Sequence, residues 1–378
     1  MTARLVGIRS TEELARRALF LALMRLTTRD RQAEERRLRD GPFRVLFIAE
    51  DAVGDTILAL PAIRAIAESH PGTVVDLVTS AGPAEVLRHS PFIRRFIVFP
   101  RHDRRRLNAW AAVRRHGPYD AVVDGMVFRG HVRSRSLAMM IGSGARYWVG
   151  EGGRGGEYLL NVVRPFVDDE APHLIRMLGL AAPFLSRAPA LRPVLTLTNG
   201  ERAGAEKSWS AEAGAPRVLV NVSTRGPDRE WPEGRFAAVT NHIRCRCPEA
   251  RIIVVGLDRD KAMMDRVARG AGAESLGSSI RELVALVAAS DMVVSPDTAV
   301  CHMASAFERP LVSIHIAGLR KFRPYDTPGV RIVGSSTVTM GNIPVQPVLE
   351  AVDEVLASVS GPPVEARGNR ARETPRLA

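Results

Sequence analysis

Cysteine is scarce in this sequence and poorly placed for bridging or for binding metal. Among 378 residues there are three cysteines, Cys245, Cys247 and Cys301. An odd number, with one Cys-x-Cys pair and no distant partners, provides neither a disulfide framework nor the ligand spacing of a zinc site. We therefore expect free thiols and no bound metal.

Long apolar runs are absent as well. The longest candidate, Ala18 to Leu26, is broken by Arg25 and is shorter than the roughly 20 residues that span a bilayer. The first residues do not show the charged start, apolar core and small-residue cleavage site of a signal peptide. We therefore expect a cytoplasmic protein.

Residues 1–41 are predicted to form a basic amphipathic helical extension. Ser10 and Glu13 have the spacing of a capping box, and apolar residues follow at helical intervals. Such a helix can lie on an anionic membrane, which would make the protein peripheral on the inner face of the cell membrane. It can equally pack on its own domain or on a second subunit.

Lysine is the third scarcity, although the formal net charge is +12. Arginine carries the positive charge and is concentrated between Arg94 and Arg135, where few acidic residues oppose it. A concentrated basic region favours an anionic partner such as a phosphorylated glycolipid or a membrane surface, and a solvated basic face is the alternative. Few aromatic residues lie in this region, so no nucleic-acid partner is expected.

Two nucleotide-binding signatures are missing. No Gly-x-Gly-x-x-Gly follows the first apolar run, Val45 to Ala49, and the chain has no Gly-x-x-x-x-Gly-Lys-Ser/Thr. A dinucleotide-dependent dehydrogenase and a P-loop nucleotidase are therefore both poorly supported.

What is present is an alternation of short apolar strands with helices. Runs such as Val45 to Ala49 and Val218 to Val222 are typical of strands buried on both faces of a parallel sheet. The alternation stops at Pro183 to Pro193 and then restarts, which predicts two α/β domains with a ligand between them, at the carboxyl ends of the strands. The predicted units are domains at 42–190 and 191–345, a last helix at 346–360 and a disordered tail at 361–378.

The first loop suited to chemistry is Gly54-Asp55, which follows the first predicted strand and precedes a helix. Glycine lets a ligand approach the backbone closely. An aspartate at the mouth of a cleft can act as a general base toward an attacking hydroxyl. The alternative is that Asp55 is the N-cap of a helix that begins at Thr56.

The second loop runs from Ser223 to Pro232 and also follows a strand. The hydroxyls of Ser223 and Thr224, with neighbouring backbone N–H groups, can cradle a diphosphate. Arg225 or Arg229 can neutralise its charge with paired donors. Each of these polar residues could also merely cap or solvate the loop.

The third loop follows the strand Met292 to Val294. Asp297 can accept hydrogen bonds from sugar hydroxyls, and a helix predicted to begin at Thr298 offers unpaired N–H groups to phosphate. His302 lies one turn further along the same face. There it can be a ligand-binding residue or a satisfied core histidine.

Taken in order, the three loops resemble glycosyltransferase family 9. The matching segments are Gly54-Asp55, Ser-Thr-Arg followed by a basic residue and Trp-Pro, and Ser-Pro-Asp-Thr-x-x-x-His at 295–302. The family comprises the heptosyltransferases of lipopolysaccharide inner-core synthesis and their relatives. The resemblance runs from about Arg44 to Val359.

The resemblance implies an α/β protein with a GT-B fold: two Rossmann-like domains with parallel sheets facing a central cleft. The acceptor would bind the first domain and the nucleotide sugar the second, and the last helix would cross back to the first domain. The implied activity is inverting transfer of heptose from ADP-heptose to a hydroxyl of an anionic glycolipid or saccharide, such as lipopolysaccharide core, with no metal and no other cofactor. Within the basic region, Arg129, Arg133 and Arg135 are expected to meet the acceptor.

Site roles carry over by position. Asp55 would be the general base, and Gly54 would lie against the donor. Ser223, Thr224 and Arg229 would hold the diphosphate.

The remaining donor roles fall on the later loops. Asp258 would accept hydrogen bonds from the ribose hydroxyls and Asp297 would meet the sugar. Thr298 and Ala299 would give N–H groups to the phosphate, and His302 would support that helix start.

Four positions depart from the family's pattern. Arg229 stands where lysine is usual and Ala299 where glycine is usual. Ala49 and Glu50 occupy a place that is often basic, and Ala317 to Arg320 replace a Gly-Pro-Thr-Asp-like loop. Two alternatives therefore stay open: a GT-B nucleotide-sugar epimerase or hydrolase, and a catalytically degenerate partner subunit.

Overall fold

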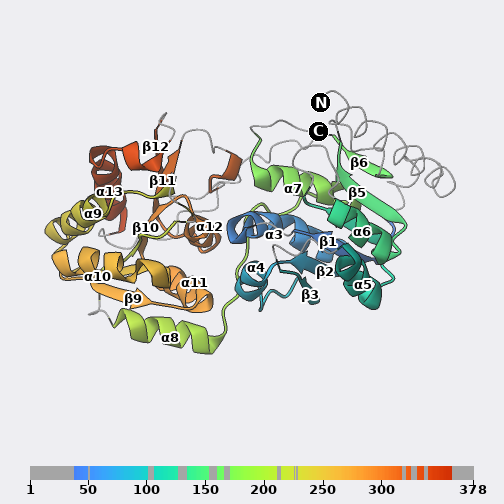
Figure 1. Cartoon of the computed structure of the whole chain (residues 1–378), viewed down its shortest axis with the longest axis horizontal. Coiled ribbons are helices and arrows are strands. Elements are labelled where there is room, and N and C mark those ends of the chain that lie inside the picture. Colours follow the sequence, from blue (N-terminus) through green and yellow to red (C-terminus); the bar gives the residue numbers. More distant parts are fainter. Residues whose placement is uncertain are drawn as a thin grey trace, which may run out of the picture.

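The structure is a computed structural model. It describes residues 38–49, 52–100, 106–126, 134–152, 160–165, 171–210, 214–224, 226, 229–316, 321–324, 330–335 and 339–359. Most of the predicted N-terminal helix, the predicted tail, and Arg129, Arg133 and Arg225 lie outside these ranges. The described chain forms two α/β domains that lie side by side (Figure 1).

The first domain is built on a six-stranded parallel sheet in the order β3-β2-β1-β4-β5-β6. The strands are β1 (Arg44–Ile48), β2 (Val74–Thr79), β3 (Arg95–Val98), β4 (Ala121–Asp124), β5 (Tyr147–Glu151) and β6 (Val162–Arg164). The helices are α3 (Val53–Ala67), α4 (Ala81–Val86), α5 (Arg106–His116), α6 (Ser134–Ser143), α7 (His173–Ala181) and the 3-10 turn η2 (Ala182–Phe184).

The second domain repeats this plan with the order β12-β11-β10-β7-β8-β9, again parallel. The strands are β7 (Arg217–Asn221), β8 (Arg251–Gly256), β9 (Glu274–Gly277), β10 (Met292–Pro296), β11 (Leu311–Ile316) and β12 (Val330–Ser335). The helices are α8 (Asn199–Trp209), α9 (Glu233–Arg246), α10 (Lys261–Gly270), α11 (Ile280–Ala289), α12 (Ala299–Ala306) and α13 (Gln346–Val359), with 3-10 turns η4 (Asp258–Asp260) and η6 (Met340–Asn342).

Both strand orders are those of a Rossmann fold. In each domain the first three strands progress outward, and the chain then returns to the middle before progressing to the other edge. Such an order leaves a crevice at the carboxyl ends of the two central strands, where ligands bind. Two Rossmann-like domains facing each other make the GT-B arrangement that the resemblance implied.

Burial on both faces explains why the central strands are uniformly apolar. On β1, Phe47 enters one core with Ile57, whereas its neighbours Leu46 and Ile48 enter another core with Val113. Successive side chains of a strand point to opposite faces, so both faces of this sheet are covered by helices.

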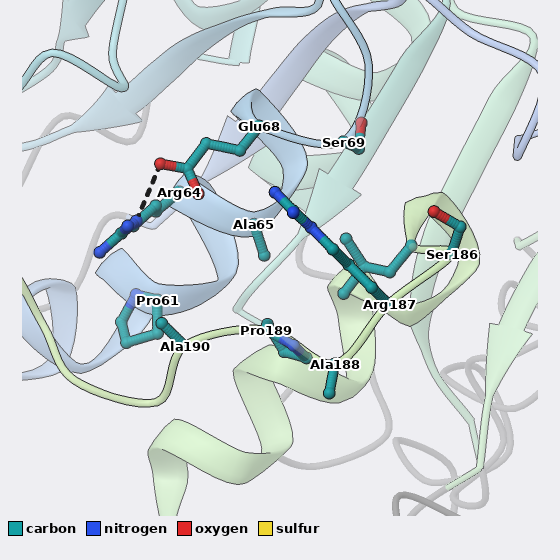
Figure 2. A pocket seen from close by; sticks show the side chains of 11 residues that line it. Pro61, Arg64, Ala65, Glu68, Ser69, Ser186, Arg187, Ala188, Pro189 and Ala190 are labelled. Atoms are coloured by element: carbon teal, nitrogen blue, oxygen red, sulfur yellow. Dashed lines mark hydrogen bonds and ion pairs between the residues drawn. The ribbon is translucent and has the colours of Figure 1, made fainter. Parts of the chain in front are cut away.

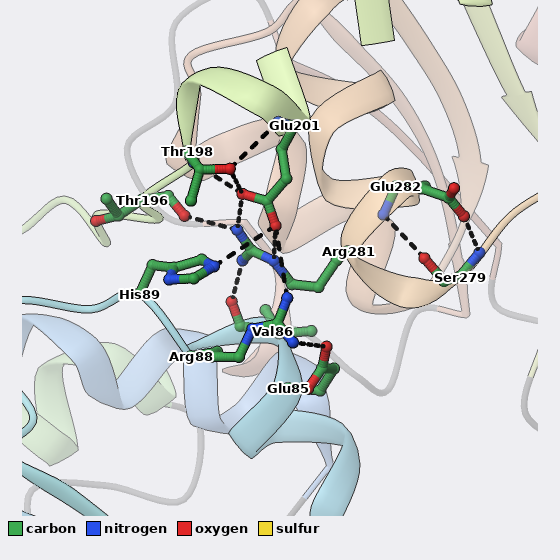
Figure 3. A network of polar contacts seen from close by, with 10 residues as sticks. All are labelled: Glu85, Val86, Arg88, His89, Thr196, Thr198, Glu201, Ser279, Arg281 and Glu282. Carbon is green, nitrogen blue, oxygen red and sulfur yellow. Dashed lines mark hydrogen bonds and ion pairs between the residues drawn. The ribbon is translucent and has the colours of Figure 1, made fainter. Parts of the chain in front are cut away.

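The two domains share a core. One continuous cluster of buried apolar residues extends from α3 and α7 of the first domain to α11 and α12 of the second. Beside it Arg281 on α11 donates to the carbonyl of Val86 in the first domain at 2.6 Å and pairs with Glu201 on α8 (Figure 3). The helices that form the two walls of the cleft are therefore in contact with each other.

The last helix departs from the expected crossover. The prediction that residues 346–360 return to the first domain is wrong for the described helix, because α13 packs on the second sheet and on α9. Val348, Val352 and Val355 enter the second domain's own core beside Val312 of β11. An amphipathic pattern predicts a buried face but does not identify the sheet that buries it.

The chain also forms helices and strands at positions where none is predicted above. The unpredicted elements are β6, α7, α8, β9 and β12. The domain boundary expected at 190/191 falls in the segment between η2 and α8, which contains no helix or strand.

Candidate functional site

A cavity of about 440 Å³ lies between the domains. It collects the loops that follow β1, β7, β8 and β10, as the strand order predicts. The predicted residues among those that line it are Gly54, Asp55, Ser223, Thr224, Arg229, Asp297, Thr298, Ala299 and His302.

A second cavity, of about 240 Å³, lies behind α3 against residues 185–190 (Figure 2). Its polar lining includes Arg64 and Glu68, which already form an ion pair at 3.0 Å. None of the predicted site residues reaches it. The interdomain cavity is therefore the candidate active site.

Asp55 lies in the first turn of α3 and lines the cavity. The alternative that it caps a helix beginning at Thr56 is wrong, because α3 begins at Val53 and its N-cap is Ala52. That N-cap makes no side-chain capping bond. The Asp55 carboxylate thus lies at the mouth of the cleft on the positive end of a helix dipole, which favours its charged form.

Gly54 lies directly against the second domain. A Cβ atom added there would lie 2.6 Å from Cδ2 of His302 and 3.7 Å from the Cα atom of Ala299. The first turns of α3 and α12 therefore meet at the cavity, and only glycine allows this approach.

Gly54→Ala is expected to destabilise the protein by about 1–3 kcal/mol, because the buried His302 ring has no room to yield. Urea unfolding measures the effect. Gly82→Ala is the matched control, since its added Cβ would meet Val53 at an ordinary 3.4 Å. If the steric account is right, adding His302→Ala to Gly54→Ala restores part of the loss, whereas strictly additive losses would contradict it.

The helix start at α12 matches the prediction. Thr298 is the N-cap, and its Oγ1 accepts a hydrogen bond from the N–H of Val300 at 3.3 Å. The same hydroxyl also lies 3.2 Å from Nδ2 of Asn221 and 3.1 Å from Oγ of Ser295. Because the side chain of Thr298 is engaged, the groups that α12 can offer to a phosphate are backbone N–H groups.

Asp297 is a buried acid of the cavity with a strongly shifted pKa. Burial raises the pKa of its carboxyl to about 6, and the charge of Asp55 adds to the rise. Arg229, whose Nη1 lies 3.4 Å from Oδ2 of Asp297, and Arg323 act in the opposite direction on this pKa. A buried carboxylate coupled to Asp55 across the cleft is typical of a functional site.

His302 is buried and neutral at neutral pH. Burial lowers the pKa of its imidazole to about 4. Its Nδ1 atom has no hydrogen-bond partner among the described residues. The neutral ring cannot supply a cation to phosphate, and it lies against Gly54 at the start of α3.

The loop after β7 is organised by Ser223. Its Oγ donates to the carboxylate of Asp260 and accepts from the N–H of Leu257 at 2.7 Å. Arg259 donates to the carbonyl of Thr224. The hydroxyl of Ser223 therefore links the end of β7 to the end of β8. The diphosphate cradle expected here would involve the whole loop and not this hydroxyl alone.

Asp258 does not reach the cavity. It is exposed on η4 and does not line the cavity, whereas Gly256 and Leu257 do. The carboxylate that faces inward from this turn is that of Asp260, held by Ser223. The turn that begins at Asp258 directs that residue to solvent, so the structure does not bring the predicted ribose-binding carboxylate to the cavity.

Arg135 also lies elsewhere. It stands on α6, on the side of the first domain away from the second (Figure 1), with its guanidinium 5.9 Å from the ring centre of Phe99. The structure does not bring it to the cavity.

Two buried polar groups near the site were not predicted. Asn221, at the end of β7, donates to Oγ of Ser295 at 3.0 Å and so ties the two central strands together. His315 on β11 is fully buried, with Nδ1 3.5 Å from Oδ1 of Asp297. A polar residue inside or at the end of an otherwise apolar run was the available signal for both.

Neither a membrane span nor a metal cluster is found in the described ranges. No helix there is long and apolar enough to cross a bilayer. No group of three or more His, Cys, Asp or Glu side chains gathers there as a metal site would require. Cys245, Cys247 and Cys301 all lie in the described ranges and form no disulfide there.

Comparison with known proteins agrees with this geometry. A family model described as glycosyltransferase family 9 (heptosyltransferase) matches residues 107–339. Lipopolysaccharide heptosyltransferase 1 of Escherichia coli K12 is 25% identical over 295 residues, covering 72% of this chain and 87% of that protein. Lipopolysaccharide heptosyltransferase 2 of Salmonella typhimurium is 22% identical over 306 residues, covering 74% and 85%.

Solved structures show the same fold. The E. coli ADP-heptose lipopolysaccharide heptosyltransferase II aligns with a TM-score of 0.67 at 21% identity, covering 84% of this chain and 100% of that one. A family 9 glycosyltransferase of Veillonella parvula aligns with a TM-score of 0.70 at 14% identity, covering 84% and 97%. The fold is GT-B, and with the family match over most of the chain this protein belongs to glycosyltransferase family 9 and is a glycosyltransferase.

Proposed function

We propose that the protein is an inverting glycosyltransferase that moves heptose from ADP-heptose to a hydroxyl of an anionic glycolipid or saccharide, such as lipopolysaccharide core. One observation carries the proposal. The cavity places a carboxylate of the first domain, Asp55, opposite an acid, a guanidinium and a helix N-terminus of the second. A base facing an anion-binding site is what direct displacement of a nucleoside diphosphate requires.

The donor half of the reaction falls to the second domain. Ser278, Ile280 and Leu283 line one end of the cavity and suit a nucleobase. The diphosphate would meet Arg229 and the backbone N–H groups at the start of α12. Asp297, next to these groups, would accept hydrogen bonds from the sugar hydroxyls.

The transfer itself is a single displacement. Asp55 takes the proton of the acceptor hydroxyl as its oxygen forms a bond to the anomeric carbon. The bond from that carbon to the diphosphate oxygen breaks, and its electron pair leaves with ADP. Arg229 and the α12 N-terminus stabilise the charge that develops on the leaving group. Attack from the face opposite ADP inverts the anomeric configuration.

The anionic acceptor is inferred from the surface of the first domain. Arg95, Arg114 and Arg115 are exposed there, and α5 and α6 contain no acidic residue. A phosphorylated glycolipid would be attracted to such a surface and would bring the protein to the inner face of the cell membrane. We accordingly propose a cytoplasmic, peripheral enzyme.

A panel of nucleotide sugars tests the donor. ADP-heptose at about 100 times its dissociation constant is expected to stabilise the protein by about 2.7 kcal/mol, which raises Tm by several degrees. UDP-sugars should give a smaller shift. Differential scanning fluorimetry makes the measurement, and Arg229→Gln should lose most of the shift because the diphosphate loses its cation.

Product analysis separates this proposal from its alternatives. Transfer gives a glycosylated acceptor with one ADP per sugar. Isomerised or released sugar without glycosylated acceptor would instead identify an epimerase or a hydrolase. Absence of any shift with ADP, ADP-heptose or other ADP-sugars would favour a degenerate partner subunit.

A further inference from the structure

Two polar side chains occupy the middle of the second sheet beside the cavity. Ser313 and His315 are both fully buried on β11, whose other residues are apolar. They are two positions apart and so point to the same face of the sheet. Ser313 pairs in register with Ser295 on β10, two residues before Asp297. Burying such groups is costly unless they are partnered.

A chain of short contacts connects these groups to Asp297. Sγ of Cys301 lies 3.1 Å from Oγ of Ser313, which lies 2.5 Å from Nε2 of His315. Nδ1 of His315 then lies 3.5 Å from Oδ1 of Asp297. That nitrogen has no hydrogen-bond partner among the described residues, and its contact with the carboxylate is longer than a formed hydrogen bond.

The charge state of the ring follows from its surroundings. Burial lowers the pKa of His315 to about 3, so the imidazole is neutral at neutral pH and carries one N–H. If the hydroxyl of Ser313 donates to Nε2, the ring proton is on Nδ1 and faces Asp297. An ionised Asp297 can only accept, so a proton on Nδ1 gives it a donor, whereas a proton on Nε2 would set the lone pair of Nδ1 against the carboxylate.

We propose that His315 is a positioning residue for Asp297, with its Nδ1–H turned to Oδ1 so that the carboxylate stays ionised and presents Oδ2 to Arg229 and the cavity. This inference rests on the proposed function, in which Asp297 binds the donor sugar. His315 itself does not line the cavity, so it acts only through Asp297.

Other charged groups around Asp297 also affect its pKa. Arg229 and Arg323 lower the pKa of Asp297, whereas burial and Asp55 raise it, with a result of about 6. His302, on the neighbouring α12, is neutral. The pKa of Asp297 is therefore close to neutral pH. The loss of one hydrogen-bond donor to its carboxylate then changes the fraction that is ionised.

The test uses the ratio of the dissociation constants of ADP and ADP-heptose, measured by calorimetry from pH 5 to 8. The ratio isolates the contribution of the sugar, where Asp297 acts. In the wild type it should fall as the pH drops below about 6. In His315→Phe the fall should occur about one pH unit higher, which lowers the sugar's contribution at pH 7 by about twofold. Affinity for ADP alone should be unchanged.

Two further variants keep the test independent of folding defects. His315→Asn keeps an N–H donor near the position of Nδ1 and should restore most of the wild-type profile. Ser313→Ala removes the hydroxyl that fixes the ring proton and should move the profile in the same direction as His315→Phe, but less. Thr240→Val, at a fully buried hydroxyl on α9 that bonds the carbonyl of Phe236, is the control for a buried polar loss alone.

The outcomes separate the inference from the proposed function. If the wild-type ratio titrates and the profiles of His315→Phe and Ser313→Ala coincide with it, His315 does not position Asp297 and the inference is wrong. If the wild type binds ADP-heptose no better than ADP at any pH, the assigned donor and the sugar-binding role of Asp297 both fail. If the pH profile of the ratio shifts as far in Thr240→Val as in His315→Phe, the shift comes from general destabilisation and the inference is wrong.

Discussion

Asp55→Asn is expected to lower kcat for glycosyl transfer by about 10²–10⁴-fold while leaving the affinity for ADP-heptose within a few-fold. The amide keeps the size of the side chain but cannot take the proton of the acceptor hydroxyl. Donor binding should survive because the residues proposed to contact the diphosphate and the sugar lie in the second domain. ADP release in the presence of acceptor measures kcat, and calorimetry measures donor affinity.

A matched control lies on the same helix. Glu68→Gln removes a carboxylate at the far end of α3, where it pairs with Arg64 and lies outside the interdomain cavity. Its kcat should equal that of the wild type. Normal turnover by Asp55→Asn would show that another group is the base.

The same variant should also change the titration of Asp297. Asp55 is one of the groups that raise the pKa of Asp297, because two carboxylates near each other disfavour a second charge. Neutral asparagine removes this effect, so the loss of sugar binding on acidification should move to lower pH. This readout depends on the distance between the two acids and not on catalysis.

The place of Asp55 beside the cavity could be predicted from the sequence, but its local structure could not. Aspartate is a preferred N-cap residue, and with Asp55 in that position the pattern places a helix start at Thr56. The helix begins at Val53 with an uncapped N-terminus. The neighbouring α12 packs against this first turn through His302, and such tertiary packing overrides local preference.

Long-range placement explains the other differences. The final helix was predicted, but whether Val348 and Val352 enter the first or the second domain depends on which sheet lies beside them. Asp258 and Asp260 are two residues apart, and only the geometry of η4 decides which one reaches Ser223. Sequence spacing carries neither kind of information.

Two features of the sequence indicate structure that is not predicted above. Thr198 and Glu201 form a complete capping box at the start of α8, and their spacing alone predicts a helix there. His315 stands out as the one ionisable residue in the apolar run Leu311–Ile316. Its partner Asp297 follows a different strand, β10. The role proposed for His315 therefore depends on the fold.

The second large effect concerns the contact between the domains. Arg281→Met is expected to lower the free energy of unfolding by about 3–5 kcal/mol, because it breaks a buried ion pair with Glu201 and leaves the carbonyl of Val86 without that donor. Figure 3 shows the guanidinium between the carboxylate of Glu201 and the carbonyl of Val86. Its Nη2 also donates to the carbonyl of Thr196 at 2.9 Å. Urea unfolding at pH 7 measures the loss.

A surface pair provides the matched control. Arg266 makes the same two-bond contact with Glu233, at 2.7 and 2.8 Å, but its side chain is 55% exposed against 5% for Arg281. Exposed pairs contribute about 0–1 kcal/mol, so Arg266→Met should cost little. Equal losses in the two variants would mean that burial and the contact with Val86 add nothing.

The pH dependence gives Arg281 a second signature. The hydrogen bonds from Arg281 are the largest cause that lowers the pKa of Glu201, from its ordinary 4.5 to about 2. A carboxyl with a lowered folded-state pKa contributes stability that is present above its unfolded value and is lost as the pH falls from about 4.5 toward 2. Arg281→Met should therefore show a smaller loss of stability between pH 5 and 3 than the wild type.

The same guanidinium holds α11 against the end of α4. The variant should therefore also lose affinity for any ligand that contacts both walls of the cleft. ADP, which we propose binds to the second domain, should bind as before.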